Sequence, residues 1–188
     1  SDMTKGLPGL SIVGLGNKAI DEAKDRVRSV ITNSLLDYPA RKLTVNLAPA
    51  ELPKDGTHYD LPIALAILTS SGQLRQADVD QAVFAGELAL DGSVRTVSGA
   101  ITIAETARNA GISTVYLPSA NVTEAMLVDN IDIIGITTLK ELFLHLKKET
   151  VLQPSKPSDT IAATTPTANA PLLDDVRGQE AAKRALII

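Results

Sequence analysis

Apolar residues recur at two different spacings in the first part of the chain, and each spacing predicts one kind of element. Residues 10–15 form a short β-rich run closed by glycines, which predicts a strand and a turn. Residues 20–31 carry apolar side chains at helical spacing with charged residues between them, which predicts an amphipathic helix capped by Asn17. Residues 43–47 alternate between apolar and polar side chains, as a strand with one buried face does. This part of the chain is therefore predicted to run strand, helix, strand.

A nearly continuous apolar segment comes next. Residues 61–71 are apolar almost all round, which predicts a central buried helix that ends at Gly72. Asp60 precedes this segment and suits the N-cap position. After it, residues 82–97 read as two strands around an Asp91-Gly92 turn, which is the pattern of a β-hairpin.

Helices and strands then alternate up to residue 149. The pattern predicts a helix, a strand, a short helix, a strand and a last helix at residues 99–110, 113–118, 123–128, 131–136 and 138–149. This order of elements predicts an α/β (α+β) domain with a mixed sheet over residues 6–149. No apolar run approaches the roughly 20 residues that a membrane helix needs. We therefore expect no membrane contact and a cytoplasmic location.

The composition changes on both sides of this predicted domain. Residues 1–5 begin with Ser-Asp-Met, which reads as a cloning remnant, and they are predicted to be disordered. Residues 150–171 are rich in Pro, Ser, Thr and Ala without any period, which predicts a disordered linker. Residues 172–188 become helical in pattern again and end without a stop signal, so we interpret them as the truncated start of another module.

The charge and the cysteine count narrow the possible functions. The 188 residues carry a formal net charge of −4, so a nucleic-acid contact would need a local basic patch. The chain has no cysteine, which excludes disulfides, thiolate zinc sites and cysteine catalysis.

The chemically richest stretch is residues 51–60, "ELPKDGTHYD", which holds one of the two histidines of the chain. His58 and the carboxylates of Asp55 and Asp60 supply some ligands for a metal, but no further histidine is near in sequence. A serine nucleophile and a glycine-rich phosphate loop are both missing from the stretch. The residues alone therefore favour a solvated turn in which Lys54 and Asp55 are exposed.

Four stretches together resemble a known family. "GLPGLSIVGL", "RVRSVITNS", "LTVNLAPAELPKDGTHYDLPIALAIL" and "GELALDGSVRTVSGA" are similar to the N-terminal domain of the Mg-chelatase-like AAA+ ATPases of the ComM/YifB group. That domain is a relative of the Lon proteolytic domain, so the resemblance implies a Lon-like (ribosomal-protein-domain-2-like) fold. The tail "DDVRGQEAAKRAL" resembles the segment before the phosphate-binding loop of the AAA+ module in the same family. The family also has a strand before "GLP", which we expect this chain to lack.

The resemblance also bears on catalysis. Active Lon domains use a serine and a lysine, and at the matching positions this chain has His58 and Ile101. A hydroxyl nucleophile needs a neighbouring amine as its base, and both partners are replaced. The resemblance therefore implies no catalytic residue and an accessory domain that is not proteolytic. Three alternatives stay open: a degenerate serine peptidase, a direct binder of single-stranded or branched DNA that acts alone, and an ATPase subunit related to magnesium chelatase.

The resemblance further implies the cofactors and partners. We expect no cofactor in this chain. We expect its parent protein to bind ATP and Mg²⁺ and to be a DNA-processing motor of the competence or branch-migration type. The expected partners are its own AAA+ module and neighbouring subunits of a hexamer, with DNA as a further candidate. The candidate contact residues are Arg41, Lys42, Lys54, His58, Arg75 and Arg95.

Overall fold

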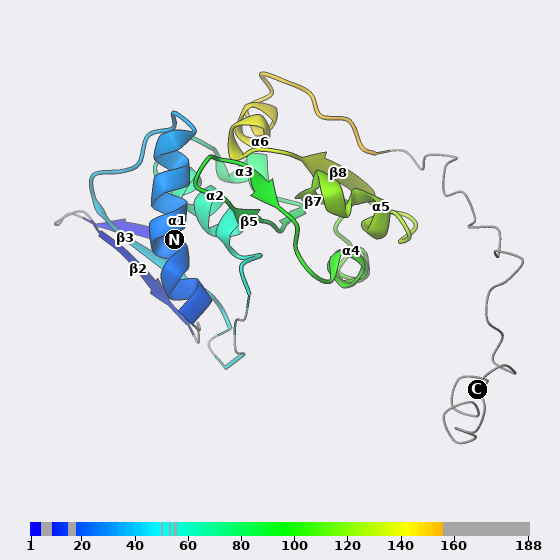
Figure 1. Cartoon of the computed structure of the whole chain (residues 1–188), viewed down its shortest axis with the longest axis horizontal. Coiled ribbons are helices and arrows are strands. Elements are labelled where there is room, and N and C mark those ends of the chain that lie inside the picture. The colour runs from blue at the N-terminus through cyan, green and yellow to red at the C-terminus, as the bar shows by residue number, and fades with distance from the viewer. Residues whose placement is uncertain (5–8, 15–17, 50, 53, 55, 156–188) are drawn as a thin grey trace, which may run out of the picture. The chain divides into compact units, whose positions relative to one another are not determined.

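The computed structural model describes residues 1–4, 9–14, 18–49, 51, 52, 54 and 56–155 (Figure 1). Contacts between residues separate 1–156 from 157–188. The linker beyond residue 155 and the predicted start of the AAA+ module lie outside the described residues.

The first sheet has the order β1-β3-β2. Strands β2 (Gly9–Val13) and β3 (Lys42–Asn46) are parallel, with Leu10 opposite Leu43. Strand β1 (Asp2–Thr4) pairs with β3 in the antiparallel sense. The prediction of a disordered start is therefore wrong for residues 2–4, and a strand precedes residue 6 where none was expected.

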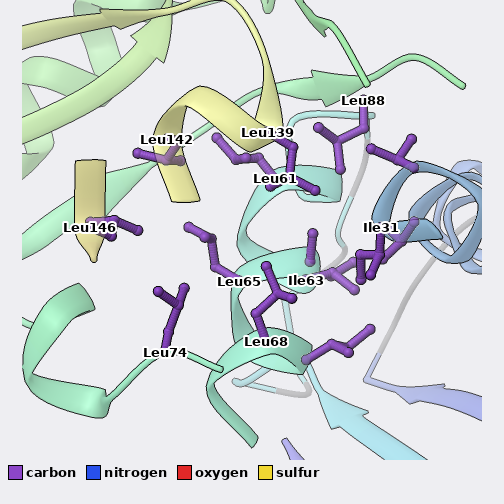
Figure 2. Packing of buried hydrophobic residues seen from close by; sticks show 14 of the residues in the cluster. Ile31, Leu61, Ile63, Leu65, Leu68, Leu74, Leu88, Leu139, Leu142 and Leu146 are labelled. Atoms are coloured by element: carbon purple, nitrogen blue, oxygen red, sulfur yellow. The ribbon is translucent and has the colours of Figure 1, made fainter. Parts of the chain in front are cut away.

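Two helices build the main core beside this sheet. Helix α1 (Lys18–Asn33) buries the predicted apolar stripe, in which Ala23, Val27, Val30 and Ile31 have no exposed surface. Helix α2 (Asp60–Ser70) is buried on nearly every side, and it ends as predicted, with Gly72 at a φ of 79° just beyond. Figure 2 shows its leucines and isoleucines packed between α1 and helix α6 (Leu139–Leu146).

The second sheet is fully parallel and has the order β4-β7-β8. It consists of β4 (Ala82–Phe84), β7 (Thr114–Pro118) and β8 (Asp132–Ile136). The predicted hairpin is confirmed only around its turn, where β5 (Glu87–Leu88) pairs with β6 (Val94–Arg95). Residues 82–84 pair with β7 instead, so the expected long first hairpin strand is split between two sheets.

Short helices and alanines complete the second core. Helix α4 (Ala100–Asn109), the 3₁₀ turn η1 (Ser119–Asn121) and α5 (Val122–Ala125) pack against the parallel sheet. The alanines of this core let the elements approach closely; they are Ala85, Ala100, Ala104, Ala107 and Ala125. Helix α3 (Gln76–Val79) was not predicted. The predicted α/β class is confirmed, and the described residues form three small sheets in place of one.

Among the described residues, the helices are all too short or too polar to cross a membrane.

Candidate functional site

The loop between β3 and α2 is fastened to the start of the β5 strand by backbone hydrogen bonds. Gly86 N donates to the carbonyl oxygen of His58 at 3.2 Å, and Leu61 N donates to the carbonyl oxygen of Gly86 at 3.1 Å. A side chain at Gly86 would lie 2.5 Å from the Val94 side chain, so only glycine fits this approach. The end of the loop therefore has a fixed backbone position next to β5.

Lys54 is buried, contrary to the prediction that it is exposed. Only 4% of the surface of this residue is exposed. The Nζ atom donates to the carbonyl oxygens of Leu52, at 2.7 Å, and of Pro49. The ammonium group is thus turned inward onto its own loop. Asp55 lies outside the described residues.

Asp60 is not an N-cap but one half of a buried ion pair. Tyr59 holds the N-cap position of α2, without a side-chain capping bond. The Asp60 carboxylate accepts two hydrogen bonds from Arg26, from Nε at 2.9 Å and from Nη2 at 3.0 Å. It also accepts a bond from Leu88 N at 3.2 Å. This carboxylate thereby joins α1, α2 and β5.

Burial and pairing shift the pKa of the Asp60 carboxyl in opposite directions. The Asp60 side chain is 1% exposed and that of Arg26 is 20% exposed. Burial raises the pKa of the Asp60 carboxyl, and the hydrogen bonds from Arg26 and from Leu88 N lower it by less. The hydrogen bond to Asp60 raises the pKa of Arg26. A carboxylate in such a position needs its arginine to stay charged.

A second polar contact lies beside this pair. Thr57 Oγ1 donates to Glu87 Oε2, and Arg95 Nη1 lies 3.8 Å from Glu87 Oε1. Glu87 therefore links the loop to the β5–β6 hairpin. Sequence reasoning missed Arg26, Thr57 and Glu87, because each is an ordinary polar residue whose partner lies far along the chain.

His58 and Ile101, which stand where active Lon domains have the serine and the lysine, are both half-buried. His58 is half-buried, and its ring lies against Tyr59 with the ring centroids 4.1 Å apart. Burial lowers the pKa of His58, against a smaller opposing effect of the Asp60 charge. Ile101 is half-buried and packs against the second core. In the described part of the chain, the hydrogen bonds of lysine amines go to carbonyl or carboxylate oxygens and not to a hydroxyl.

The other basic candidates differ in how far they are neutralised. Arg75 binds Asp78, with Nη2 2.5 Å from Oδ1, and Arg95 faces Glu87. Arg41 and Lys42 are exposed neighbours at the start of β3, and neither forms an ion pair with another described residue. No cluster of three or more potential metal ligands occurs within the ranges described.

Comparisons with known proteins agree with the resemblance. The family model described as subunit ChlI of Mg-chelatase matches residues 1–121. The uncharacterized protein YifB of Escherichia coli is 42% identical over 186 residues, which cover 99% of this chain and 36% of YifB. The competence protein ComM of Haemophilus influenzae is 39% identical, with coverage of 99% and 36%. This chain thus spans about a third of the length of these relatives.

A more distant likeness extends to a protease. The Lon protease of Mycolicibacterium smegmatis is 26% identical over 175 residues, which cover 87% of this chain and 21% of the protease.

Proposed function

The chain belongs to the family described as subunit ChlI of Mg-chelatase, and on this premise we propose that it is a non-proteolytic, Lon-like accessory domain of a Mg-chelatase-like AAA+ ATPase. The likeness to Lon protease and the mixed α/β architecture support the Lon-like fold. The parent protein would bind ATP and Mg²⁺ through its AAA+ module and assemble as a hexamer. The domain would act in contacts with neighbouring subunits or with DNA.

One observation carries the non-proteolytic part of the proposal: the polar groups of the loop are used in holding the fold together. Lys54 binds two carbonyl oxygens of its own loop, and Thr57 binds Glu87. Asp60 binds Arg26 and Leu88 N. An acyl-transfer site needs a nucleophile and a base that face each other and a substrate. The loop instead directs these groups to protein partners, as a scaffold does.

Peptide hydrolysis tests this directly. The chain, incubated with casein and with fluorogenic peptides, is expected to release no product above the buffer control. The His58→Ala variant should behave in the same way. Turnover by the wild type that is abolished in His58→Ala would establish the degenerate-peptidase alternative in place of the scaffold.

The exposed basic residues are where this domain would contact DNA. Arg41 and Lys42 are adjacent and exposed, whereas Lys54 is buried and Arg75 and Arg95 face carboxylates. The first two residues are therefore the best candidates for phosphate contacts. Since the chain as a whole carries a net charge of −4, such contacts are weak unless the parent protein adds others.

Band shifts at several salt concentrations test this site in the full-length parent protein. Reversing both charges, Arg41→Glu with Lys42→Glu, should weaken DNA binding and reduce the slope of log K against log salt by about 1 to 2. The matched control is Lys140→Glu with Lys147→Glu, which changes the net charge equally at two exposed positions on and after α6. Equal losses in both double variants would mean that this pair is not a specific contact.

The description of the family model favours a second candidate, an ATPase subunit of a magnesium chelatase. That activity would be a property of the parent protein. Magnesium chelation supported by the full-length protein, together with the other subunits of a chelatase, would establish it; ATP-dependent DNA remodelling without chelation would favour the first candidate.

A further inference from the structure

The segment that leaves the last helix is held on the folded domain by few contacts. We call residues 150–155 the strap; in Figure 1 it runs in yellow and orange from α6 past β8. Leu152 N donates to His145 Nδ1 at 3.0 Å, and Ser155 N donates to the carbonyl oxygen of Ile133 at 2.8 Å. Leu152 is half-buried against the main core, whereas Val151, Gln153 and Pro154 are exposed. His145 thus supplies a side-chain contact in the middle of the strap.

The geometry around His145 defines its protonation state when the strap is bound. A backbone N–H can only donate, so Nδ1 must be the acceptor from Leu152 and must carry no proton. The proton of the neutral ring is then on Nε2, which lies 2.9 Å from Tyr116 Oη and donates to it. Tyr116 is itself fixed by stacking on Phe84, with ring centroids 4.8 Å apart and planes inclined by 7°. Both ring nitrogens are therefore engaged from opposite sides.

We propose that His145 is a proton-operated latch for the strap. When Nδ1 takes up a proton, the ring presents an N–H to the N–H of Leu152, and the hydrogen bond between them is lost. The Nε2 bond to Tyr116 is kept, because Nε2 donates in both states. Protonation therefore removes the side-chain anchor of the strap, which keeps the Ser155 bond to Ile133, without freeing α6 from β7.

The titratable and charged groups around the His145 ring have partners of their own or lie on the same helix. The titratable group in contact with the ring is Tyr116, and burial raises the pKa of its phenol, so that group stays neutral. On α3, Asp78 is bound to Arg75 and interacts electrostatically with Lys148. The other charged residues on or just after α6 are Lys140, Glu141, Lys147 and Glu149, of which Glu141 is bound to Thr137.

Loss of the side-chain anchor would change the reach of the strap. The six residues of the strap, when extended, span up to about 20 Å. The latch acts at a place distinct from the loop proposed above as a scaffold, and it does not depend on that proposal.

Amide hydrogen exchange on the ¹⁵N-labelled chain tests the latch. Between about pH 7.5 and pH 5.5, where histidine changes its charge, exchange at Leu152 and Ser155 is expected to accelerate about tenfold after correction for the intrinsic rate. Amides of β7 should show no such change. His145→Asn keeps an acceptor near the place of Nδ1 and does not titrate, so the pH response should disappear. His58→Asn changes the other histidine and should leave the response intact.

The ring nitrogens give a readout that needs no variant. Their ¹⁵N chemical shifts should report a bare Nδ1 and a protonated Nε2 on His145 at neutral pH. A proton on Nδ1 at neutral pH, a strap that exchanges equally at both pH values, or a pH response that survives in His145→Asn would each overturn the latch.

Discussion

Two arginine–carboxylate pairs of this protein have the same chemistry and opposite properties. Arg26 and Asp60 lie 34 positions apart in sequence and join α1 to α2, with the carboxylate 1% exposed. Arg75 and Asp78 lie three positions apart at the start of α3; the Asp78 side chain is 6% exposed, but the Arg75 side chain is 73% exposed, against 20% for Arg26. Burial raises the pKa of Asp60, whereas the hydrogen bond from Arg75 lowers that of Asp78 to about 2.

The difference teaches that position, not pairing, decides what a charge contributes. A buried carboxylate has lost its hydration and depends on one partner, so removing that partner leaves an uncompensated charge. A pair that is open to water on the arginine side keeps much of its hydration, and salt screens it. The polar loop of this chain owes its fixed geometry to the first kind of pair.

Breaking the buried pair should have the largest effect. Arg26→Met is expected to lower the free energy of unfolding by about 3 kcal/mol at pH 7, the lower end of the range for such pairs because Arg26 keeps some exposure. Chemical denaturation measures this. In the variant, Asp60 keeps the hydrogen bond from Leu88 N but is buried without its arginine, so its folded-state pKa lies above its unfolded value. The stability it contributes is then present at low pH and is lost as the pH rises through that pKa. The loss should therefore shrink toward pH 4.

The matched control removes both charges. Arg26→Met combined with Asp60→Asn keeps an acceptor for Leu88 N and leaves no buried charge. It should recover most of the stability that Arg26→Met loses. A double variant as unstable as the single one would show that packing of the arginine, and not the ion pair, holds these elements together.

Lys54→Met should have the next largest effect. Two loop carbonyl oxygens lose their donor, which is expected to cost about 1 to 2 kcal/mol. The change should be concentrated in the loop, so amide exchange at Gly56 and Thr57 should accelerate more than exchange in α2. Lys42→Met is the control, because Lys42 is exposed on β3, and it should change stability by less than about 0.5 kcal/mol. Equal effects of the two changes would contradict the buried position of Lys54.

Replacing His58 should have a smaller effect on stability, and this effect should depend on pH. Burial lowers its folded-state pKa below the ordinary value of 6.5. The unfolded chain therefore binds more protons just below pH 6.5, and stability is lost as the pH falls from there through the folded-state pKa. His58→Gln should flatten this part of the stability curve relative to the wild type, as measured by urea denaturation at several pH values. An unchanged slope would place the titrating group elsewhere.

The sequence predicted those features that depend on neighbouring residues. The apolar stripe of α1 and the all-round apolar character of α2 were read correctly, because helical spacing alone reveals which face is buried. The turn at Asp91-Gly92 was also read correctly. Contacts between distant residues were missed. Nothing local distinguishes β4, which pairs with β7, from β5, which pairs with β6.

The same limit applies to the candidate site. A lysine before Asp-Gly reads as an exposed turn residue, and only the path of the loop turns Lys54 inward. Arg26 lies among five other charged residues in the helical segment, and no periodicity reveals that it meets Asp60. The replacements at His58 and Ile101 were visible in the sequence only through the family resemblance, since neither residue is unusual by itself.

The smallest effect on stability is expected from the pair of Arg75 and Asp78, which is open to water at the arginine. Asp78→Asn should lower the denaturation midpoint at pH 7 only slightly, because water and salt screen this pair on the side of Arg75. The pair still has a pH signature. The pKa of Asp78 falls from 3.8 to about 2 in the folded protein, so its contribution is present above pH 3.8 and is lost as the pH falls through about 2. Stability of the wild type and of Asp78→Asn should therefore converge in strong acid, and 1 M salt should remove any difference between them at higher pH. A loss at pH 7 as large as that of Arg26→Met would mean that the exposure of the arginine does not govern the strength of these pairs.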